Sequence, residues 1–421
     1  MVALYIIVFL IWTLKNYFKF KFNISTYILL FYLFGMLSCG IIFIYYPQTI
    51  QYPERLSVFS IGYHIVFLVL LLFPLVVFGD NLRLNNIDIS SKQIRKLSWW
   101  IIAPSFVSII ISLSTIFLLF SLQNFHSARQ LFLDGSLEGS FVSKLGPIGY
   151  FISLGKCCSS IALVLGIFNL FKNRDKSLTT YLLLISSLAY PIFTLSFAGR
   201  DGILRWVQFL IFSLILTNKS LSYKRFKFFW WTLFILFVSG IIVLTTITSD
   251  RFSESDNGVL YSLFRYIGEP YYIFSYGYER FGYNPMSDTI FSPFPIITQE
   301  KPELLDLNSQ FSASYYLNTF HTIVGDFMIR TGILKGAILM SLISIILTTI
   351  FGLKSSHCKI SFPLFTGFIF YYEIMLTGAF YYMHNDRFIQ FAIVFYILLS
   401  AIYGRKTLFP KFRHRISSKI L

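Results

Sequence analysis

Residues 249–284 read SDRFSESDNGVLYSLFRYIGEPYYIFSYGYERFGYN and open the one long interval, Ser249–Arg330, that lacks a membrane-length apolar run. The interval holds ten of the chain's 19 acidic residues, nine of its tyrosines and five of its prolines. A bilayer excludes irregular backbone exposed to lipid, so we expect the interval to lie mostly outside the hydrocarbon. Its aromatic content argues against disorder. We therefore expect it to form one side of a functional site, and the membrane helices to form the other.

The rest of the chain has the composition of an integral membrane protein. Hydrophobic residues make up 56% of the 421 positions and charged residues only 13%, whereas soluble domains average about 25% charged residues. We predict an all-α polytopic protein, a single integral membrane domain over residues 1–421 with about 11 transmembrane helices. The large extracytoplasmic loop, residues 249–330, would lie between spans 8 and 9 and contain short helices. The predicted spans are Val2–Leu14, Ile24–Tyr46, Ser57–Gly79, Trp99–Phe120, Pro147–Phe171, Leu178–Ala198, Gly202–Thr217, Phe228–Thr248, Thr331–Gly352, Phe362–Tyr382 and Phe388–Tyr403.

Basic residues set the predicted orientation. If alternate connections face the same side, one side collects 22 of the 35 lysines and arginines. Cytoplasmic connections carry such an excess, so we expect a cytoplasmic C-terminus and an extracytoplasmic long loop. The net charge of +16 is divided among short connections and forms no patch, so nucleic acid is not a predicted partner. The lipid bilayer is a predicted partner.

Several motifs are missing from the sequence. It contains no GxxxxGK[ST], no HExxH and no DxD of the kind that holds a metal with a nucleotide-sugar. We therefore predict no cofactor and no metal. An enzyme built on this chain would act on the outer face, where nucleotide substrates are absent.

A glycine-flanked turn, Gly199-Arg200-Asp201-Gly202, joins two apolar runs almost without a loop. It would place Arg200 at the outer membrane surface, where the planar guanidinium could bind a lipid diphosphate. The alternative is an arginine that only marks the interface. Asp201 and Arg205 are four residues apart, and an ion pair along one helix is the simplest account of both.

The aromatic segment Tyr261–Arg280 carries further candidates. Arg265 and Arg280 could bind phosphate, while Tyr266 and Tyr272 could stack on sugar rings. Gly268 and Pro270 predict a break into short helices on the membrane surface. The alternative is an interfacial anchor, because tyrosine is common at that depth.

Candidate proton-transfer groups lie in this segment and just before the ninth span. His321 could accept a proton from a sugar hydroxyl near neutral pH, although a lone histidine is more often structural. Glu269 and Asp326 are further candidates, and Arg330 is a secondary phosphate contact that could instead pair with Asp326 four residues earlier. Lys156 and Glu373 are charges within apolar runs to which the sequence assigns no partner.

Together these features resemble the O-antigen (oligosaccharide repeat unit) polymerase family, the Wzy class. The resemblance rests on the turn at residues 199–202, on the Tyr/Gly/Arg-rich start of the large loop, and on the sequence leading into the ninth span. The short motifs are Asn284-Pro-Met, Phe291-Ser-Pro-Phe, Asn318-Thr-Phe and Gly325-Asp-Phe. The family usually shows Asp-Phe-Gly where this chain has Asp326-Phe327-Met328.

The resemblance implies glycosyl transfer on the outer face of a bacterial inner membrane, in the synthesis of lipopolysaccharide or a related surface polysaccharide. A growing glycan would move from undecaprenyl (polyprenyl) diphosphate to the terminal sugar of a new lipid-linked unit. The partners would be the polyprenyl-diphosphate-linked oligosaccharide and a chain-length regulator and flippase of the same pathway. Two alternatives stay open: an O-antigen ligase, and a non-enzymatic flippase or transporter of lipid-linked oligosaccharide.

Overall fold

The computed structural model describes residues 2–50, 57–82, 89–120, 147–196, 201–217, 258–281, 322–352 and 360–379, with isolated positions 87, 199, 231 and 238 between them. These residues are almost entirely helical, and the only β pairing within them is a single bridge between Ile87 and Ile360. The helices are α1 (Val2–Phe20), α2 (Ile24–Tyr45), α3 (Val58–Asn81), α4 (Ser91–Phe120), α7 (Pro147–Phe171), α8 (Leu178–Ser186), α9 (Ala189–Leu195), α10 (Asp201–Thr217), α12 (Gly258–Phe281), α14 (Ile323–Gly352) and α15 (Phe362–Thr377), with a short 3-10 turn at Pro47–Thr49.

Seven helical segments of the described residues are long and apolar enough to cross a membrane. They correspond to seven of the predicted spans, including the first, which at 19 residues is longer than its predicted range. Two further predicted spans correspond to the shorter helices α10 and α15. The predicted spans Phe228–Thr248 and Phe388–Tyr403 lie outside the described residues, apart from positions 231 and 238. The polytopic helical class is confirmed, and the count of eleven stays a prediction.

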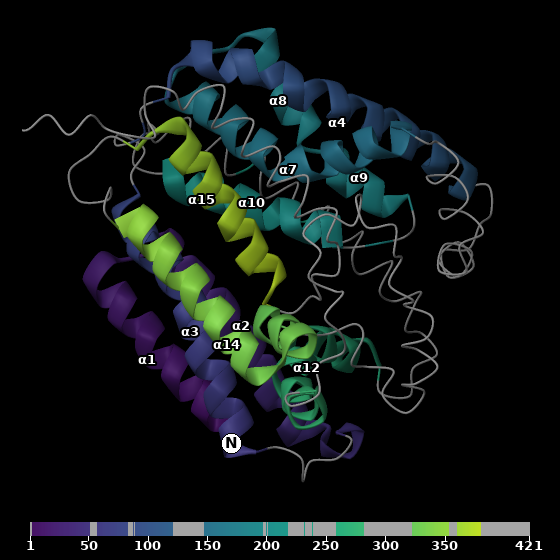
Figure 1. Ribbon diagram of the computed structural model, residues 1–421. Helices are drawn as coiled ribbons and strands as arrows, with labels where there is room; N and C mark the ends of the chain where they lie inside the picture. The colour runs from purple at the N-terminus through teal and green to yellow at the C-terminus, as the bar shows by residue number, and fades with distance from the viewer. Residues whose placement is uncertain are drawn as a thin grey trace, which may run out of the picture.

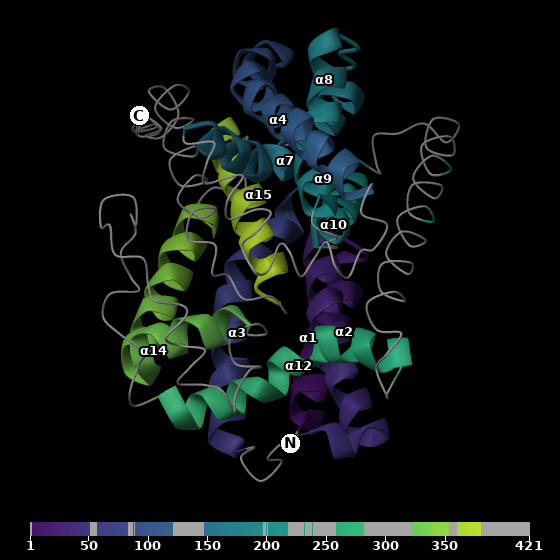
Figure 2. The same ribbon diagram turned by 90° about the vertical axis from the view of Figure 1, so that its right-hand side faces the viewer.

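The helices form two packed groups that share one apolar core. Helices α1, α2, α3 and α14 lie side by side, and α4, α7, α8, α9 and α10 form the second group (Figure 1). Helix α15 joins the groups by packing on both α3 and α7. Helix α12 crosses α2 and α3 near the end of the bundle where the N-terminus lies (Figure 2).

The outward faces of α1 and α14 are strongly apolar. Ile11 is 60% exposed, and Leu334 is 73% exposed. Phe18 and Ile345 are also exposed on these helices. Soluble proteins rarely expose so continuous an apolar surface, and lipid is the solvent that such a surface suits.

Two breaks differ from the predicted pattern. The expected division of Tyr261–Arg280 into short helices is wrong, because α12 runs unbroken through Gly268 and Pro270. Close packing on α2 stabilises the helix here and outweighs the low helix propensity of these two residues. The predicted span Leu178–Ala198 is instead divided into α8 and α9. Pro191 has no N–H to donate to the carbonyl of Ser187, and the Ser159 hydroxyl donates to that carbonyl in its place.

Helix α14 changes direction at Gly332. This glycine has φ 80°, a left-handed value that other residues rarely adopt. The helical segment from Ile323 to Gly332 lies across the bundle beside α12. The part of α14 after Gly332 rises beside α3 (Figure 2). The ninth span therefore begins where predicted, near Thr331, but it is preceded by a short helical arm that reaches back to Ile323.

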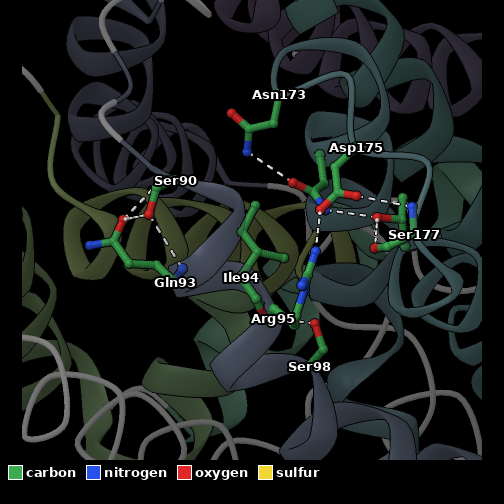
Figure 3. Close-up of polar contacts among 10 residues, drawn as sticks. Ser90, Gln93, Ile94, Arg95, Ser98, Asn173, Asp175 and Ser177 are labelled. Atoms are coloured by element: carbon green, nitrogen blue, oxygen red, sulfur yellow. Dashed lines mark hydrogen bonds and ion pairs between the residues drawn. The ribbon is translucent and has the colours of Figure 1, made fainter.

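Connections that were predicted to share the cytoplasmic side meet at one end of the molecule. Arg95 at the start of α4 donates to Asp175 after α7 at 3.3 Å (Figure 3). The Lys172 ammonium donates to the Ile87 carbonyl, and Ile87 bridges to Ile360 before α15. These contacts agree with the predicted alternation of sides.

Candidate functional site

Helix α12 carries a charged cluster from the polar interval. The Nε of Arg265 donates to both carboxylate oxygens of Glu269, at 3.2 and 3.1 Å. The Tyr272 hydroxyl donates to the same carboxylate at 3.4 Å. The Glu269 side chain is only 4% exposed, while that of Arg265 is 30% exposed. The structure thus brings together three of the predicted site residues, with the arginine the more accessible partner.

Close approach to α2 holds this cluster in place. A Cβ on Gly268 would lie 2.4 Å from the Cys39 backbone nitrogen, so only glycine allows α12 to pack this tightly. Tyr272 then meets Phe43 edge-on, with ring centroids 5.7 Å apart. Tyr261 packs on Tyr46 at 4.9 Å. The glycine that predicted a break is therefore the contact point of the helix.

Burial changes the acidity of Glu269. Desolvation raises its pKa to about 7, against the lowering effects of the Arg265 charge and of hydrogen bonds from Arg265 and Tyr272. The carboxyl therefore exchanges protons near neutral pH. This property suits a general acid or base.

The start of α14 meets α12 at the same end of the bundle. Thr322 accepts the backbone N–H of Asp326 on its carbonyl at 3.0 Å. The backbone N–H of Ile323 donates to the carbonyl of Gly378, the C-cap of α15, at 2.8 Å. Asp326, a predicted site residue, thus lies in the first turn of a helix whose beginning is bonded to the end of α15.

His64 of α3 was not among the predicted site residues. Its ring is fully buried, stacks on Phe274 of α12 at 4.2 Å, and contacts a hydroxyl through each nitrogen. The partners are Tyr5 at Nδ1 and Thr322 at Nε2, each at 2.6 Å. An ionisable side chain inside an apolar span was the signal that could have identified it.

Arg205 has a different partner from the one predicted. Its guanidinium lies 3.4 Å from Glu373 of α15, and Ser160 of α7 donates to the same carboxylate oxygen at 2.7 Å. Asp201 accepts the Tyr190 hydroxyl, and the Tyr190 ring lies under the guanidinium at 4.6 Å. The predicted Asp201–Arg205 pair is therefore corrected to a buried pair between α10 and α15. The sequence could not find it because 168 residues separate the partners.

A second intramembrane cation lies in the same group of helices. The ammonium of Lys156 on α7 lies 3.6 Å from the ring centroid of Phe193 on α9. The aromatic face is a favourable surface for a cation away from water.

The remaining predicted residues are placed only in part. Arg200 and His321 lie outside the described residues, although their neighbours Gly199, Asp201 and Thr322 are described. Tyr266, Arg280 and Arg330 occupy helical positions of α12 and α14, and their side chains lie outside the description. Comparisons of the chain with protein families, with curated proteins and with solved structures found no match.

Proposed function

We propose that the protein is a membrane glycosyltransferase that polymerises lipid-linked oligosaccharide repeat units. The growing glycan would leave polyprenyl diphosphate and join the terminal sugar of a new lipid-linked unit. The observation that supports this proposal most is the packing of α12, which comes from the polar interval, across the ends of membrane helices with its Arg265–Glu269–Tyr272 cluster. A site of this kind meets lipid and water together, as its substrate does.

The chemistry requires stabilisation of a leaving diphosphate and removal of one proton. The bond between the anomeric carbon and the diphosphate oxygen breaks, and an acceptor hydroxyl forms the new glycosidic bond. Arginine suits the departing anion because its charge is permanent and its donors form a fork. In the proposal Arg200, Arg265, Arg280 and Arg330 supply these cations. The hydroxyl proton passes to a general base.

Three side chains are candidates for that base, and they differ in what supports them. Glu269 has a pKa raised to about 7 and lies next to the Arg265 guanidinium. Asp326 lies at the start of α14, which packs on α12. His321 precedes Thr322 directly in the sequence. Tyr266 and Tyr272 would contribute sugar contacts.

One observation favours the non-enzymatic alternative, a flippase. A transporter places charges inside its bundle, and the Arg205–Glu373 pair lies between α10 and α15 with a glutamate side chain only 1% exposed. Among the described residues, the second carboxylate oxygen of Glu373 has no hydrogen-bond donor. A buried carboxyl of this kind is typical of proton relays in transporters. We favour the polymerase because α12, which comes from the polar interval, packs against the membrane helices with its own charged cluster.

A deletion of the gene followed by a gel of surface polysaccharide tests the choice. The polymerase proposal predicts loss of long chains while a single repeat unit remains attached. Loss of even that single unit would indicate a ligase or a flippase instead.

A further inference from the structure

The imidazole of His64 joins three parts of the fold in one buried chain of hydrogen bonds. Tyr5 comes from α1, His64 from α3, and Thr322 immediately precedes α14. All three side chains are 1% exposed or less. Enclosed polar groups of this kind are costly unless each is satisfied, and a satisfied network fixes the elements that contribute to it.

The chain is continuous with the ring proton on either nitrogen. The Tyr5 hydroxyl lies 2.6 Å from His64 Nδ1 and donates to the Tyr271 carbonyl at 3.4 Å. The Thr322 hydroxyl lies 2.6 Å from Nε2. A hydroxyl can donate or accept, so Tyr5 and Thr322 can both bond the ring in either tautomer.

Thr322 transmits this restraint to α14. Its hydroxyl oxygen accepts the Gly325 N–H at 3.4 Å, and its carbonyl accepts the Asp326 N–H at 3.0 Å. These are the contacts of a helix cap, which set where the first turn begins. The ring that holds Thr322 also stacks on Phe274 of α12.

We propose that His64 is a positioning residue for the glycosyl transfer, and that through Thr322 it fixes the first turn of α14 and thereby the carboxylate of Asp326 beside α12. This inference rests on the proposed function. Histidine is suited to this task because two opposite ring nitrogens allow it to bond Tyr5 and Thr322 at once.

Hydrogen exchange tests the bridge without any assay of activity. Thr322→Val and Tyr5→Phe should each accelerate amide exchange in the first turn of α14 several-fold, with little effect on exchange elsewhere. Tyr371→Phe is the matched control, because it also removes a buried bond between helices, from Tyr371 to the Leu71 carbonyl at 2.8 Å. It should leave that turn unchanged. Unaltered exchange in both test variants overturns the bridge.

Kinetics with lipid-linked repeat units test the positioning role. Thr322→Val should lower kcat about tenfold with little change in KM, and Thr322→Ser should recover most of the loss. In an Asp326→Asn background, Thr322→Val should have no further effect, because it acts through Asp326. Independent, multiplying losses overturn the role, as does an Asp326→Asn variant with wild-type kcat. A wild-type protein that makes no polymer overturns the proposed function itself, and the exchange result still decides on the bridge.

Discussion

The Glu269 carboxyl combines near-complete burial with a guanidinium 3.1 Å away, and this combination makes its ionisation sensitive to pH. Burial raises the pKa to about 7, so the carboxylate that pairs fully with Arg265 forms only as pH rises through that value. If transfer needs the ionised Glu269 carboxylate, the rate should rise with pH around 7. Arg265→Gln removes the lowering effect of the cation, so the rise should move to higher pH.

The pH profile of polymer formation by purified protein checks this expectation. Glu269→Gln should abolish the rise near 7. Glu279→Gln, which changes an exposed acid of the same helix, should preserve it. An unchanged profile in Arg265→Gln would show that another group controls the reaction.

Arg200 is the residue of the glycine-flanked turn that we expect to bind the carrier diphosphate. Removal of one charge-assisted phosphate contact in Arg200→Ala should cost about 1.5–3 kcal/mol, or one to two decades in rate. Arg200→Lys keeps the charge without the fork and should recover only part of the activity. Chain length on a polysaccharide gel, at equal protein abundance in membranes, measures both. Normal chains in Arg200→Ala would make this arginine an interface anchor.

Arg205 is expected to act on stability, because its partner Glu373 is buried in the bundle. Arg205→Met leaves that carboxylate without its ion-pair partner, and such losses cost about 3–5 kcal/mol. The double variant Arg205→Met/Glu373→Met replaces the whole pair with apolar side chains and should recover much of the stability. Thermal unfolding of the purified variants decides. Equal destabilisation of the single and the double variant would contradict a pair that acts as a unit.

At the scale of elements, the crossing of α12 over α2 depends on Gly268. A methyl group there would meet α2 backbone, which cannot swing away as a side chain can. Gly268→Ala should therefore destabilise the protein by about 1–3 kcal/mol and separate α12 from α2. Gly62→Ala, at a helical site with open space around it, should be neutral or slightly stabilising. A Gly268→Ala protein with wild-type melting temperature and activity would refute this contact.

Some features of these helices could be predicted from the sequence, and others depend on contacts between distant residues. Apolar length alone predicts a span, so the seven spans found within the described residues could be recognised from composition. Gly268 and Pro270 were misinterpreted because their local preference for a break is overcome by packing on α2, where Gly268 meets Cys39, a residue 229 positions away in sequence. Gly332 does change the direction of α14, because it adopts a positive φ that interrupts the helix.

The candidate site likewise combines contacts that are local in the sequence with contacts between distant helices. The pairing of Arg265 with Glu269 is local, but it was not predicted, because the expected break at Gly268 lies between these two residues. The partner of Arg205 and the whole Tyr5–His64–Thr322 chain depend on contacts between distant helices. Sequence patterns on one helix carry no information about such partners.

At the scale of the whole molecule, several helix ends gather around α12. They are the end of α2 and the beginnings of α1, α3 and α14, and the end of α15 reaches the beginning of α14. Tyr5 reaches the Tyr271 carbonyl, and Ile323 reaches Gly378. This convergence brings α12, which comes from the polar interval, against several membrane helices. It agrees with the predicted arrangement, in which these ends share the extracytoplasmic side.

The most direct test of this account is reconstitution with its proposed substrate. Purified protein in liposomes would receive the native lipid-linked repeat unit, isolated from cells that lack this protein, and the products would be measured by mass. We predict glycans of many repeat units on one carrier, with one polyprenyl diphosphate released for each bond formed, and far less of both in Arg265→Gln. Lipid-linked units that stay single, whether or not they cross the membrane, would contradict the account.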